Sequence, residues 1–503
     1  MPKSYVKRIQ EAKIYDLVIK TPVDEAPQLS LRLGNRVLLK REDLQPIFSF
    51  KLRGAYNKML SLSEAELARG VIAASAGNHA QGLAMAANKI GAQATIVMPT
   101  TTPQIKVSAV KSLGATVLLK GDSYDEASDF AKDLVVEKNM TYIHPFDDPD
   151  VIAGQGTIAM EILEQVPENL DAVFIAVGGG GLCAGMAAYI KTIRPSIKII
   201  AVEAEDSACL DAAIKAGRRV QLKHVGIFAD GTAVAKIGKE TFRILKDTVD
   251  EVITVSVDEI CASIKDTFED TRSICEPAGA LGLAGLKKYV DSTGVKGQTL
   301  LAVECGANIN FDRLRYISER TEIGEKREAI LAVTIPEKPG SFKLFCMSLN
   351  KRNITEFNYR MGDSTKAHIF VGLEVSSDND RFSLVKDLDR KAYPIVDMTD
   401  NEIAKLHIRH MVGGRAQEAI NEMIFRFEFP ERPGALMQFL IKLGDRWNIS
   451  MFHYRNHGSA DGRVLVGLQI PVKDRGELGS FLDELDYSWV EETDNPAYQF
   501  FLS

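Results

Sequence analysis

Short apolar runs alternate with longer amphipathic stretches between about residue 37 and residue 310 of the chain. The runs fall at residues 37–40, 71–75, 94–98, 115–120, 172–177, 197–202 and 300–304. Apolar runs of this length, separated by helical stretches, are typical of buried parallel strands. The pattern therefore predicts an α/β body, with helices on both faces of a parallel sheet. Ligands in such bodies bind beyond the carboxyl ends of the strands, so we expect the chemistry in the loops that follow the runs.

The last third of the chain contains an internal repeat. Residues 332–360 and 426–455 share a strand that ends in Pro, a Pro-Gly turn, an apolar helix, an Asn-Ile pair and an aromatic strand that ends in Tyr-Arg. Each copy is predicted to fold as β-α-β followed by another strand. Neither copy pairs a plausible nucleophile with a base, so we expect a binding module here and not a second active site. In the second copy Leu436, Leu440 and Leu443 share one helical face, which is typical of core.

Composition and charge narrow the class of protein. A chain of 503 residues is expected to form two to four globular units. The formal net charge of −7, with no basic block, makes nucleic acid and anionic membranes poor partners. No apolar run is long enough to span a bilayer, and the first residues have the features of neither a signal peptide nor a transit peptide. Six scattered cysteines without C-x-x-C spacing predict free thiols and a cytoplasmic protein.

Two loops are candidates for ligand binding. Gly178 to Gly181 follow an apolar run and open a helix, so their N–H groups and the helix N-terminus are expected to bind an anion. The same glycines partly satisfy a dinucleotide fingerprint with Glu203 at the ribose position, which leaves a nicotinamide enzyme as an alternative. Residues 74–82, A-S-A-G-N-H-A-Q-G, offer backbone donors to a carboxylate, with Asn78 and His79 as polar projections.

Lys51 is the candidate nucleophile. It lies in F-S-F-K-L-R-G-A-Y, residues 48–56, where Phe48, Phe50 and Tyr56 are expected to desolvate its amine and Arg53 to repel a second positive charge. Both effects lower the pKa of a lysine, as Schiff-base chemistry requires. An amine, an anion-binding loop and a carboxylate loop on one α/β body indicate a pyridoxal phosphate enzyme that acts on an amino acid.

Five motifs in this order resemble those of the threonine dehydratases. They are S-F-K-L-R-G at 49–54, S-A-G-N-H-A-Q-G at 75–82, G-G-G-G-L at 178–182, E-P-A-G-A at 276–280 and C-G-A-N at 305–308. The repeat resembles the paired ACT-like regulatory domains of the biosynthetic, isoleucine-sensitive members. The resemblance argues against the nicotinamide alternative. It implies a fold type II catalytic domain of two parallel-sheet α/β subdomains at 1–325, and two α+β ACT-like domains (β-α-β-β-α-β) at 328–402 and 423–494.

The resemblance also implies site residues. Lys51 matches the lysine that holds the cofactor and acts as the general base. The matched cofactor-binding residues are Phe50, Asn78, Gly178, Gly179, Gly180, Gly181, Leu182 and Cys305. The matched substrate-binding residues are Ser75, Ala76, Gly77, Asn78 and His79. Cys305 takes the place next to the pyridine nitrogen, where a neutral thiol leaves the ring a weaker electron sink than a carboxylate would. Glu276 lies in a matching motif without an assigned role, and no metal site is predicted.

The implied activity is the conversion of L-threonine to 2-oxobutanoate and ammonia, by removal of the Cα proton and elimination of the β-hydroxyl. This is the first step toward isoleucine, with isoleucine as the expected inhibitor and valine as the opposing activator. The candidate effector contacts are Gly434, Leu436, Leu440, Tyr359 and Tyr454. A homotetramer is also implied. Two alternatives stay open: a serine-specific or other β-elimination or β-replacement enzyme of the same fold, and a sensor without catalytic activity.

Overall fold

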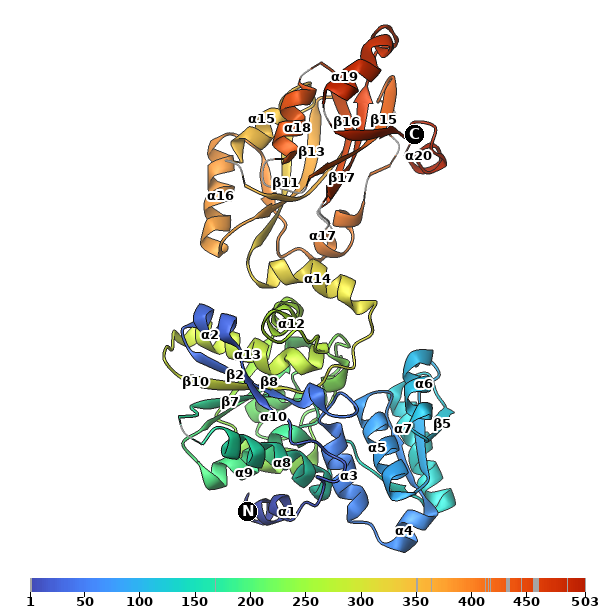
Figure 1. Cartoon of the computed structure of the whole chain (residues 1–503), viewed down its shortest axis with the longest axis vertical. Helices are drawn as coiled ribbons and strands as arrows, with labels where there is room; N and C mark the ends of the chain where they lie inside the picture. The colour runs from blue at the N-terminus through green and yellow to red at the C-terminus, as the bar shows by residue number, and fades with distance from the viewer. Residues whose placement is uncertain are drawn as a thin grey trace. The chain divides into compact units, whose positions relative to one another are not determined.

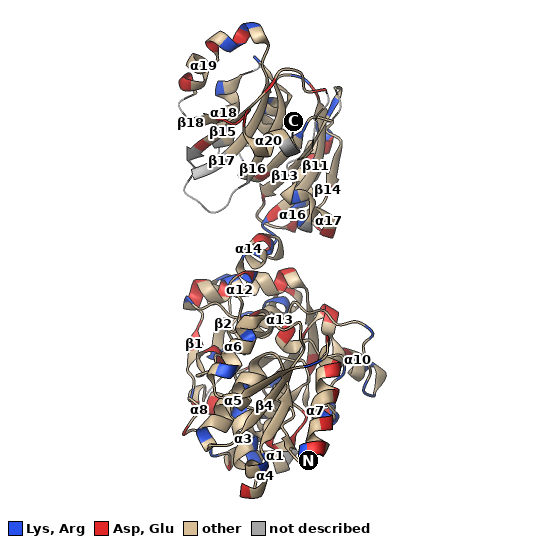
Figure 2. Ribbon diagram, turned by 90° about the vertical axis from the view of Figure 1, so that its right-hand side faces the viewer, with Lys and Arg blue, Asp and Glu red and all other residues tan. Residues whose placement is uncertain are grey.

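The chain forms two compact units, Met1–Gly324 and Glu325–Ser503 (Figure 1). The computed structural model describes residues 2–167, 169–349, 352–362, 364–411, 413–414, 416, 418–430, 435–444, 446–455, 461–485 and 487–502. Within these residues, no helix is both long enough and apolar enough to cross a membrane. Lys and Arg residues are interspersed with Asp and Glu residues along the helices of both units (Figure 2).

The first unit contains a six-stranded sheet in the order β1-β2-β10-β7-β8-β9. All neighbours are parallel except β1, which is antiparallel to β2. The strands are β1 (Val23–Glu25), β2 (Arg36–Arg41), β7 (Ala172–Ala176), β8 (Lys198–Ala204), β9 (Glu251–Val255) and β10 (Thr299–Glu304). Strands β7 and β10 are buried along their whole length, because helices cover both faces of the sheet.

Helices α2 (Pro27–Leu33), α12 (Val257–Thr271) and α13 (Pro277–Thr293) lie on one side of this sheet (Figure 1). On the other side lie α1 (Pro2–Gln10), α8 (Pro149–Gln165) and α9 (Gly181–Ile193). The remaining helical segments of this part are η1 (Glu42–Leu44), η2 (Glu205–Ser207), α10 (Cys209–Ala216), η3 (Asp230–Thr232), α11 (Lys239–Thr248) and α14 (Arg313–Gly324).

A second, smaller sheet in the same unit has the order β5-β4-β3-β6, with all neighbours parallel. Its strands are β3 (Val71–Ala74), β4 (Ala94–Met98), β5 (Thr116–Leu119) and β6 (Thr141–Tyr142), and its helices are α3 (Lys51–Leu60), α4 (Glu64–Arg69), α5 (Asn78–Ile90), α6 (Gln104–Ser112) and α7 (Tyr124–Lys138). Val71 and Ala73 pack into the core shared with α3 and α5, whereas Ile72 and Ala74 pack against α7. This alternation is that of a strand with a helix on each face. Two parallel sheets with their helices confirm the predicted α/β body.

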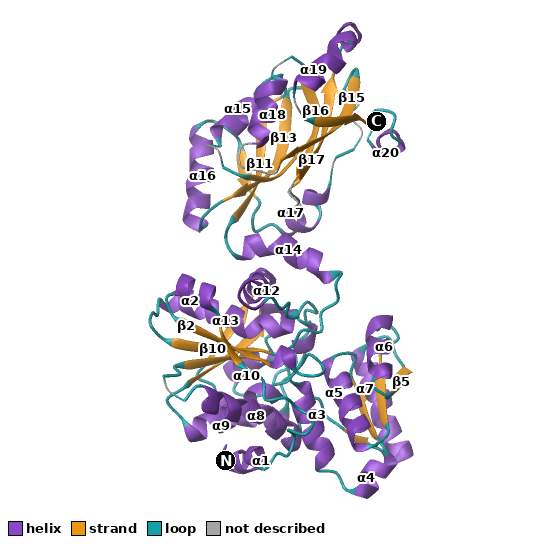
Figure 3. Ribbon diagram, viewed as in Figure 1, coloured by secondary structure: helices purple, strands orange, loops and turns teal. Residues whose placement is uncertain are grey.

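The second unit is an eight-stranded antiparallel sheet in the order β14-β11-β13-β12-β16-β17-β15-β18 (Figure 3). The first copy of the repeat supplies β11 (Glu328–Pro336), α15 (Ser341–Ser348), β12 (Ile354–Arg360), β13 (Lys366–Glu374), α16 (Asp378–Arg390) and β14 (Ile395–Asp397). The second supplies β15 (Glu422–Pro430), α18 (Ala435–Leu443), β16 (Asn448–Arg455), β17 (Asp461–Gln469), η5 (Val472–Glu477), α19 (Leu478–Glu484) and β18 (Ser488–Glu491). The connecting and terminal helices are α17 (Glu402–Leu406), η4 (Ile408–His410) and α20 (Pro496–Phe501). The β-α-β-β-α-β order of each copy confirms the prediction.

The two copies join edge to edge through their second strands. Phe357 of β12 pairs with Tyr454 of β16, and Tyr359 pairs with Phe452. Because each Phe-x-Tyr pair meets the other in reverse order, the two copies are related by an approximate two-fold axis. Their helices α15 and α18 pack together over one shared apolar core.

Candidate active site

Backbone hydrogen bonds place Lys51 close to the carboxyl end of strand β10. Lys51 is the first residue of α3, and the preceding loop is bonded to the residues that follow β10: Phe50 N–H donates to the Cys305 carbonyl (3.2 Å), and Ala307 N–H donates to the Phe48 carbonyl (2.9 Å). Phe48 adopts a φ of 55°, which turns the chain sharply at this point. Lys51 therefore lies beyond the carboxyl end of a central parallel strand, where ligands bind in sheets of this class.

The amine of Lys51 lies in a poorly solvated place. Its Nζ donates to the carbonyl of Pro145 (3.1 Å) and lies 5.2 Å from the centre of the Phe50 ring. Burial lowers the pKa of Lys51 to about 8, and a negative charge on Glu276 opposes this shift. A substantial fraction of the amine is thus neutral near physiological pH, as a nucleophile or a base requires.

Arg53 has no part in lowering this pKa, and the prediction that it repels charge from Lys51 is wrong. Its guanidinium is fully buried and bonded to two carboxylates, with Nε 2.7 Å from Glu42 Oε2 and Nη1 2.6 Å from Glu161 Oε1. Residues two apart on a helix point to different sides. Of the aromatic side chains expected to desolvate the amine, Phe48 is 57% exposed, and Tyr56 directs its hydroxyl to Asp16.

The carbonyl groups of the glycine loop are bonded to neighbouring side chains. The carbonyl of Gly178 accepts from Cys209 Sγ (3.4 Å), and that of Gly179 accepts from Thr241 Oγ1 (2.8 Å). In a trans peptide the N–H points opposite to the carbonyl, so the N–H groups of Gly179 and Gly180 face away from these partners. The loop continues into α9, whose first N–H groups have no partner within the helix. Donors of this kind are suited to bind an anion.

The glycine loop and the Lys51 amine share one neighbour, the segment of Pro145 and Phe146. A Cβ atom at Gly179 would lie 2.2 Å from Cγ of Phe146, and one at Gly181 would lie 2.9 Å from its carbonyl oxygen. Gly180 has a φ of 91°, a conformation that favours glycine. The segment that receives the Lys51 hydrogen bond therefore also packs on the glycine loop, so the predicted nucleophile and the predicted anion-binding loop share one neighbour.

We expect Gly179→Ala to weaken the binding of pyridoxal phosphate by about 10-fold or more, because the new methyl group must displace the Phe146 ring or the loop. Equilibrium dialysis with the cofactor alone measures this effect. Gly479→Ala is the matched control, since a Cβ atom there meets nothing within 4 Å. An unchanged dissociation constant in Gly179→Ala would contradict the assignment of the loop.

The loop of residues 75–79 leads from β3 into α5. Ser75 N–H donates to the Val97 carbonyl (3.1 Å), and Gly77 N–H lies 3.3 Å from Ser75 Oγ. Residues 75–78, Ala76 among them, are half-buried, and a Cβ atom at Gly77 would meet nothing within 4 Å. The start of α5 is thus open to a ligand, as a carboxylate site at a helix N-terminus requires.

His79 does not project from this loop, and that part of the prediction is wrong. Its ring is buried, Nε2 lies 2.9 Å from the Ile143 carbonyl, and Nδ1 is a buried atom without a hydrogen-bond partner in the described part of the chain. Burial, together with the charge of Lys51, lowers the pKa of His79 to about 3. The ring is therefore neutral and orients the segment just before Pro145.

Asn78 and the residue that follows Cys305 both bond to Glu276. Asn78 Nδ2 donates to Glu276 Oε1 (2.6 Å), and Asn78 Oδ1 accepts from Asn308 Nδ2 (2.7 Å). Cys305 is buried directly after β10, and burial raises the pKa of its thiol well above the ordinary value, so the thiol is neutral. The carbonyl oxygen of Gly306, the next residue, accepts from the N–H of Glu276 (3.0 Å).

These residues fit pyridoxal phosphate. The amides of the glycine loop suit its phosphate, the Lys51 amine suits its aldehyde, the Asn78 amide suits its ring hydroxyl, and the Cys305 thiol suits its pyridine nitrogen. Phe50 and Leu182 lie next to Lys51 and the glycine loop, respectively. The nicotinamide alternative fits poorly, because both carboxylate oxygens of the buried Glu203 accept N–H groups, from Leu210 and Asp211 (2.8 Å each).

Comparisons with known proteins agree with this geometry. Residues 14–306 match the family described as pyridoxal-phosphate dependent enzyme, and residues 319–408 and 413–502 each match the C-terminal regulatory domain of threonine dehydratase. The chain is 54% identical to a biosynthetic L-threonine dehydratase of Burkholderia multivorans, over 99% of each chain. The chain belongs to the biosynthetic threonine dehydratase family.

Solved structures agree as well. The processed form of threonine deaminase isoform 2 from Solanum lycopersicum is 46% identical, with a TM-score of 0.63, and the match covers 63% of this chain and 93% of that one. Serine racemase from Dictyostelium discoideum is 34% identical, with a TM-score of 0.57, over 61% of this chain and 99% of that one. The predicted fold type II catalytic domain with C-terminal regulatory domains is thereby confirmed.

Pro145 and Phe146 were missed from the sequence, and Asn308 and Glu276 were found in motifs but given no role. Pro145 and Phe146 follow β6, which has only two residues and gave no apolar run. Asn308 lies inside a motif that drew attention only to its cysteine. Glu276 precedes Pro277 at the start of α13, a pattern typical of a helix N-terminus, and its carboxylate caps no N–H group there. Sequence reasoning therefore found each motif but not which motifs touch.

The candidate effector residues lie in the second unit. Leu436, Leu440 and Tyr454 are buried in its core, and the hydroxyl of Tyr359, also buried, donates to Glu337. Gly434 falls outside the described residues, as does the rest of its Pro-Gly turn.

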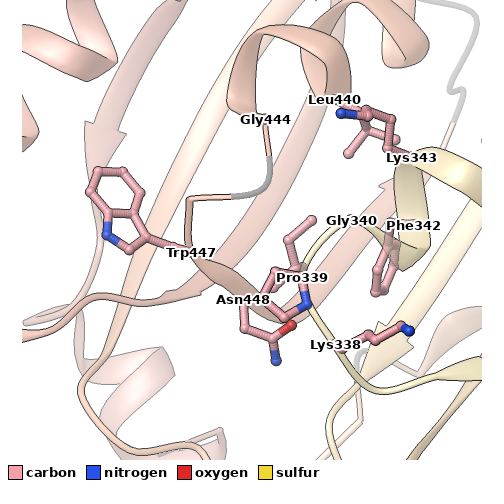
Figure 4. Close-up of a pocket in the computed structure, with 10 residues that line it drawn as sticks. Lys338, Pro339, Gly340, Phe342, Lys343, Leu440, Gly444, Trp447 and Asn448 are labelled. Atoms are coloured by element: carbon pink, nitrogen blue, oxygen red, sulfur yellow. The ribbon is translucent and has the colours of Figure 1, made fainter.

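The corresponding turn of the first copy lines a pocket with the second copy (Figure 4). The lining residues are Lys338, Pro339, Gly340, Phe342 and Lys343 from the first copy, and Leu440, Gly444, Trp447, Asn448 and Ile449 from the second.

Proposed function

We propose that the chain converts L-threonine to 2-oxobutanoate and ammonia with pyridoxal phosphate held by Lys51. The observation that supports this most directly is the Lys51 amine, with a pKa lowered to about 8, next to the segment that packs on the glycine loop. Pyridoxal phosphate, when bound, supplies an aldehyde for the substrate amine and a ring that withdraws electrons from Cα.

Residues of the chain remove the Cα proton, bind the substrate carboxylate and contact the pyridine nitrogen. The neutral amine of Lys51 removes the Cα proton as the general base. The loop of residues 75–79 holds the substrate carboxylate at the start of α5 through the N–H groups of Ala76 and Asn78, since those of Ser75 and Gly77 already have partners. The neutral thiol of Cys305 leaves the pyridine nitrogen without a full negative partner, which favours prompt loss of the β-hydroxyl over racemisation.

Serine remains the alternative substrate, supported by the 34% identity to a serine racemase. Comparison of kcat/KM for L-threonine and L-serine, with detection of 2-oxobutanoate and pyruvate, decides between them. A chain that binds the cofactor but releases neither product would support the sensor without catalytic activity.

We further propose that isoleucine inhibits and valine activates the enzyme through the second unit. The turn at residues 338–340 brings the N-terminus of α15 to a pocket of about 10 Å³, which must widen to admit an amino-acid carboxylate. Ser341 Oγ, at the first residue of α15, is buried without a hydrogen-bond partner in the described part of the chain. Phe342 and Leu440 offer apolar surface to a branched side chain. Asn448 crosses from the second copy, since its Nδ2 donates to Glu337 Oε1 (2.9 Å).

We expect isoleucine to inhibit the intact chain and to have no effect on a chain that ends at Gly324, because the second unit is then absent. Asn448→Ala should raise the half-inhibiting isoleucine concentration by about 10-fold, since it leaves the Glu337 carboxylate without one donor. Threonine turnover with increasing isoleucine measures both effects. Asn353 occupies the Asn448 position in the other copy of the repeat, and Asn353→Ala is the variant to compare with Asn448→Ala. A truncated chain that is active and still isoleucine-sensitive would refute the proposal.

The assembly and the location are proposals as well. A homotetramer would let the regulatory units couple to the active sites through symmetric contacts. The cytoplasm is the proposed location, in keeping with six buried free cysteines and a bacterial relative matched over 99% of its length.

A further inference from the structure

Glu276 lies at the centre of the site without a role in the steps described so far. Its side chain is 4% exposed and stands directly before α13. Its N–H donates to the Gly306 carbonyl (3.0 Å), and a Cβ atom at Gly306 would lie 2.7 Å from Glu276 Oε1. The carboxyl group therefore packs against the backbone that follows Cys305, on the side of the site that faces Asn78.

A chain of hydrogen bonds with a fixed direction passes through Asn78. It begins at the Ile47 carbonyl, which can only accept, so Asn308 must present Nδ2 there (2.8 Å). Asn308 Nδ2 also donates to Asn78 Oδ1 (2.7 Å), and this fixes the amide of Asn78 with its Nδ2 toward Glu276 Oε1 (2.6 Å). The second hydrogen of Asn78 Nδ2 is then the donor that this residue can offer to a ligand.

Several charged groups face Glu276. Burial is the main cause that raises the pKa of Glu276 to about 7, and the negative charge of Asp230 in η3 adds to it. The Asn78 hydrogen bond, Lys106 of α6 and Arg313 of α14 act in the opposite direction. Lys106 Nζ lies 2.8 Å from Asp230 Oδ2.

Among the residues assigned to catalysis or cofactor binding, the titratable groups that interact with Glu276 are the Lys51 amine and the Cys305 thiol. Over the physiological range the Glu276 carboxyl changes between neutral and negative, and Oε1 can accept from Asn78 in both states.

We propose that Glu276 is a positioning residue, which holds the Asn78 amide so that its remaining N–H points to the ring oxygen of pyridoxal phosphate. The proposal rests on the proposed function. A donor at this place stabilises the ionised form of the ring oxygen. When Glu276 is negative it polarises the Asn78 amide, so its charge is transmitted to the bound cofactor through one side chain.

The test compares Glu276→Gln and Glu276→Ala with the unsubstituted chain, all with pyridoxal phosphate and without substrate. Glu276→Ala removes the acceptor and frees the Asn78 amide to turn, so the cofactor dissociation constant should rise by about 10-fold. Glu276→Gln keeps an acceptor oxygen but cannot ionise, so the dissociation constant should stay within about 3-fold. The visible absorbance of the bound cofactor should change with pH around 7 in the unsubstituted chain, and this change should disappear in Glu276→Gln.

Glu203→Gln is the matched control. Glu203 is a buried carboxyl of the same unit with a pKa raised to about 7, mainly by burial, but it bonds to the start of α10 and not to Asn78. The absorbance change near pH 7 should persist in this variant. If Glu276→Ala proves unstable, Asn308→Ala releases the same chain of hydrogen bonds at its other end and should weaken cofactor binding in the same direction.

Two results would overturn the proposal: unchanged cofactor binding in both alanine variants, or an absorbance change near pH 7 that persists in Glu276→Gln. Neither result would contradict the proposed function. That function fails instead if the unsubstituted chain binds no pyridoxal phosphate, or binds it and releases no keto acid from threonine.

Discussion

Lys51→Ala is expected to lower threonine turnover by at least about 1,000-fold and to abolish the visible absorbance of covalently held pyridoxal phosphate. The side chain has two tasks in the proposed mechanism, which are to hold the cofactor aldehyde and to remove the Cα proton. Its environment suits both, because burial lowers the pKa of the amine to about 8 and the Pro145 carbonyl orients it. Release of 2-oxobutanoate and the cofactor spectrum are the two measurements.

Lys51→Arg separates charge from nucleophilicity. Arginine keeps the positive charge but stays protonated, so turnover should be lost in this variant as well. The matched control is Lys58→Ala on the same helix, which removes a lysine that pairs with Asp148 (2.9 Å) and Asp150 (3.2 Å), outside the site. Turnover should fall by less than about 3-fold in this control. Substantial turnover by Lys51→Ala would end the assignment of Lys51 as the base.

Arg53→Met is expected to destabilise the first unit by about 3–5 kcal/mol, the largest stability effect we anticipate. Arg53 and Lys40 are buried with two carboxylates, Glu42 and Glu161, and Lys40 Nζ lies 2.7 Å from Glu161 Oε2. The four charges cancel. Removal of the guanidinium leaves a buried negative charge uncompensated, and desolvation then opposes folding. Urea unfolding at pH 7 measures the change in the free energy of unfolding.

The same cluster makes the stability of the folded chain depend on pH in the acid range. Burial by itself would raise the pKa of Glu42, but Arg53, Lys40 and Thr21 together outweigh it and hold that pKa below the ordinary value of 4.5. A lowered pKa in the folded state means that the contribution to stability is present above pH 4.5 and is lost as the pH falls through the folded-state pKa. Unsubstituted chain should therefore lose stability in this acid range, and Arg53→Met should lose less of it there.

Lys132→Met serves as the control for Arg53→Met. Lys132 pairs with Asp129 at 2.8 Å, yet the two side chains are 63% and 74% exposed. Water screens such a pair, so its loss should cost less than about 0.5 kcal/mol. A cost below about 1 kcal/mol for Arg53→Met would show that the buried cluster does not hold α3, and with it Lys51, in place.

Strand prediction succeeded where the strand is a continuous apolar run, which burial on both faces explains for β3, β7 and β10 but not for β5, a partly exposed strand at the edge of its sheet. Strands β2, β3, β4, β5, β7, β8 and β10 all coincide with such runs. Strands β1 and β6 have three and two residues, too few for a pattern, and β9 is a partly exposed strand at the edge of its sheet. The repeat was visible because both copies kept the same turn, helix and aromatic strand.

The electrostatics of the site could not be predicted in the same way. Arg53 was assigned to Lys51 because the two are close in sequence, but its partners Glu42 and Glu161 are 11 and 108 residues away. Glu276 and Asn78 are 198 residues apart, and Asn308 and Asn78 are 230 apart. Nothing in the local pattern around either asparagine indicates which atom accepts and which donates.

The sequence alone was enough to predict the two kinds of sheet, the glycine turn before α9, the internal repeat and Lys51 as the reactive amine. Each of these rests on local properties: burial periodicity, backbone freedom and motif order. Only the tertiary structure determines which charged groups pair, which amine is desolvated and how the Asn78 amide is oriented. Coulomb attraction, desolvation and hydrogen bonding depend on distance in space, and the fold brings together residues that the chain keeps far apart.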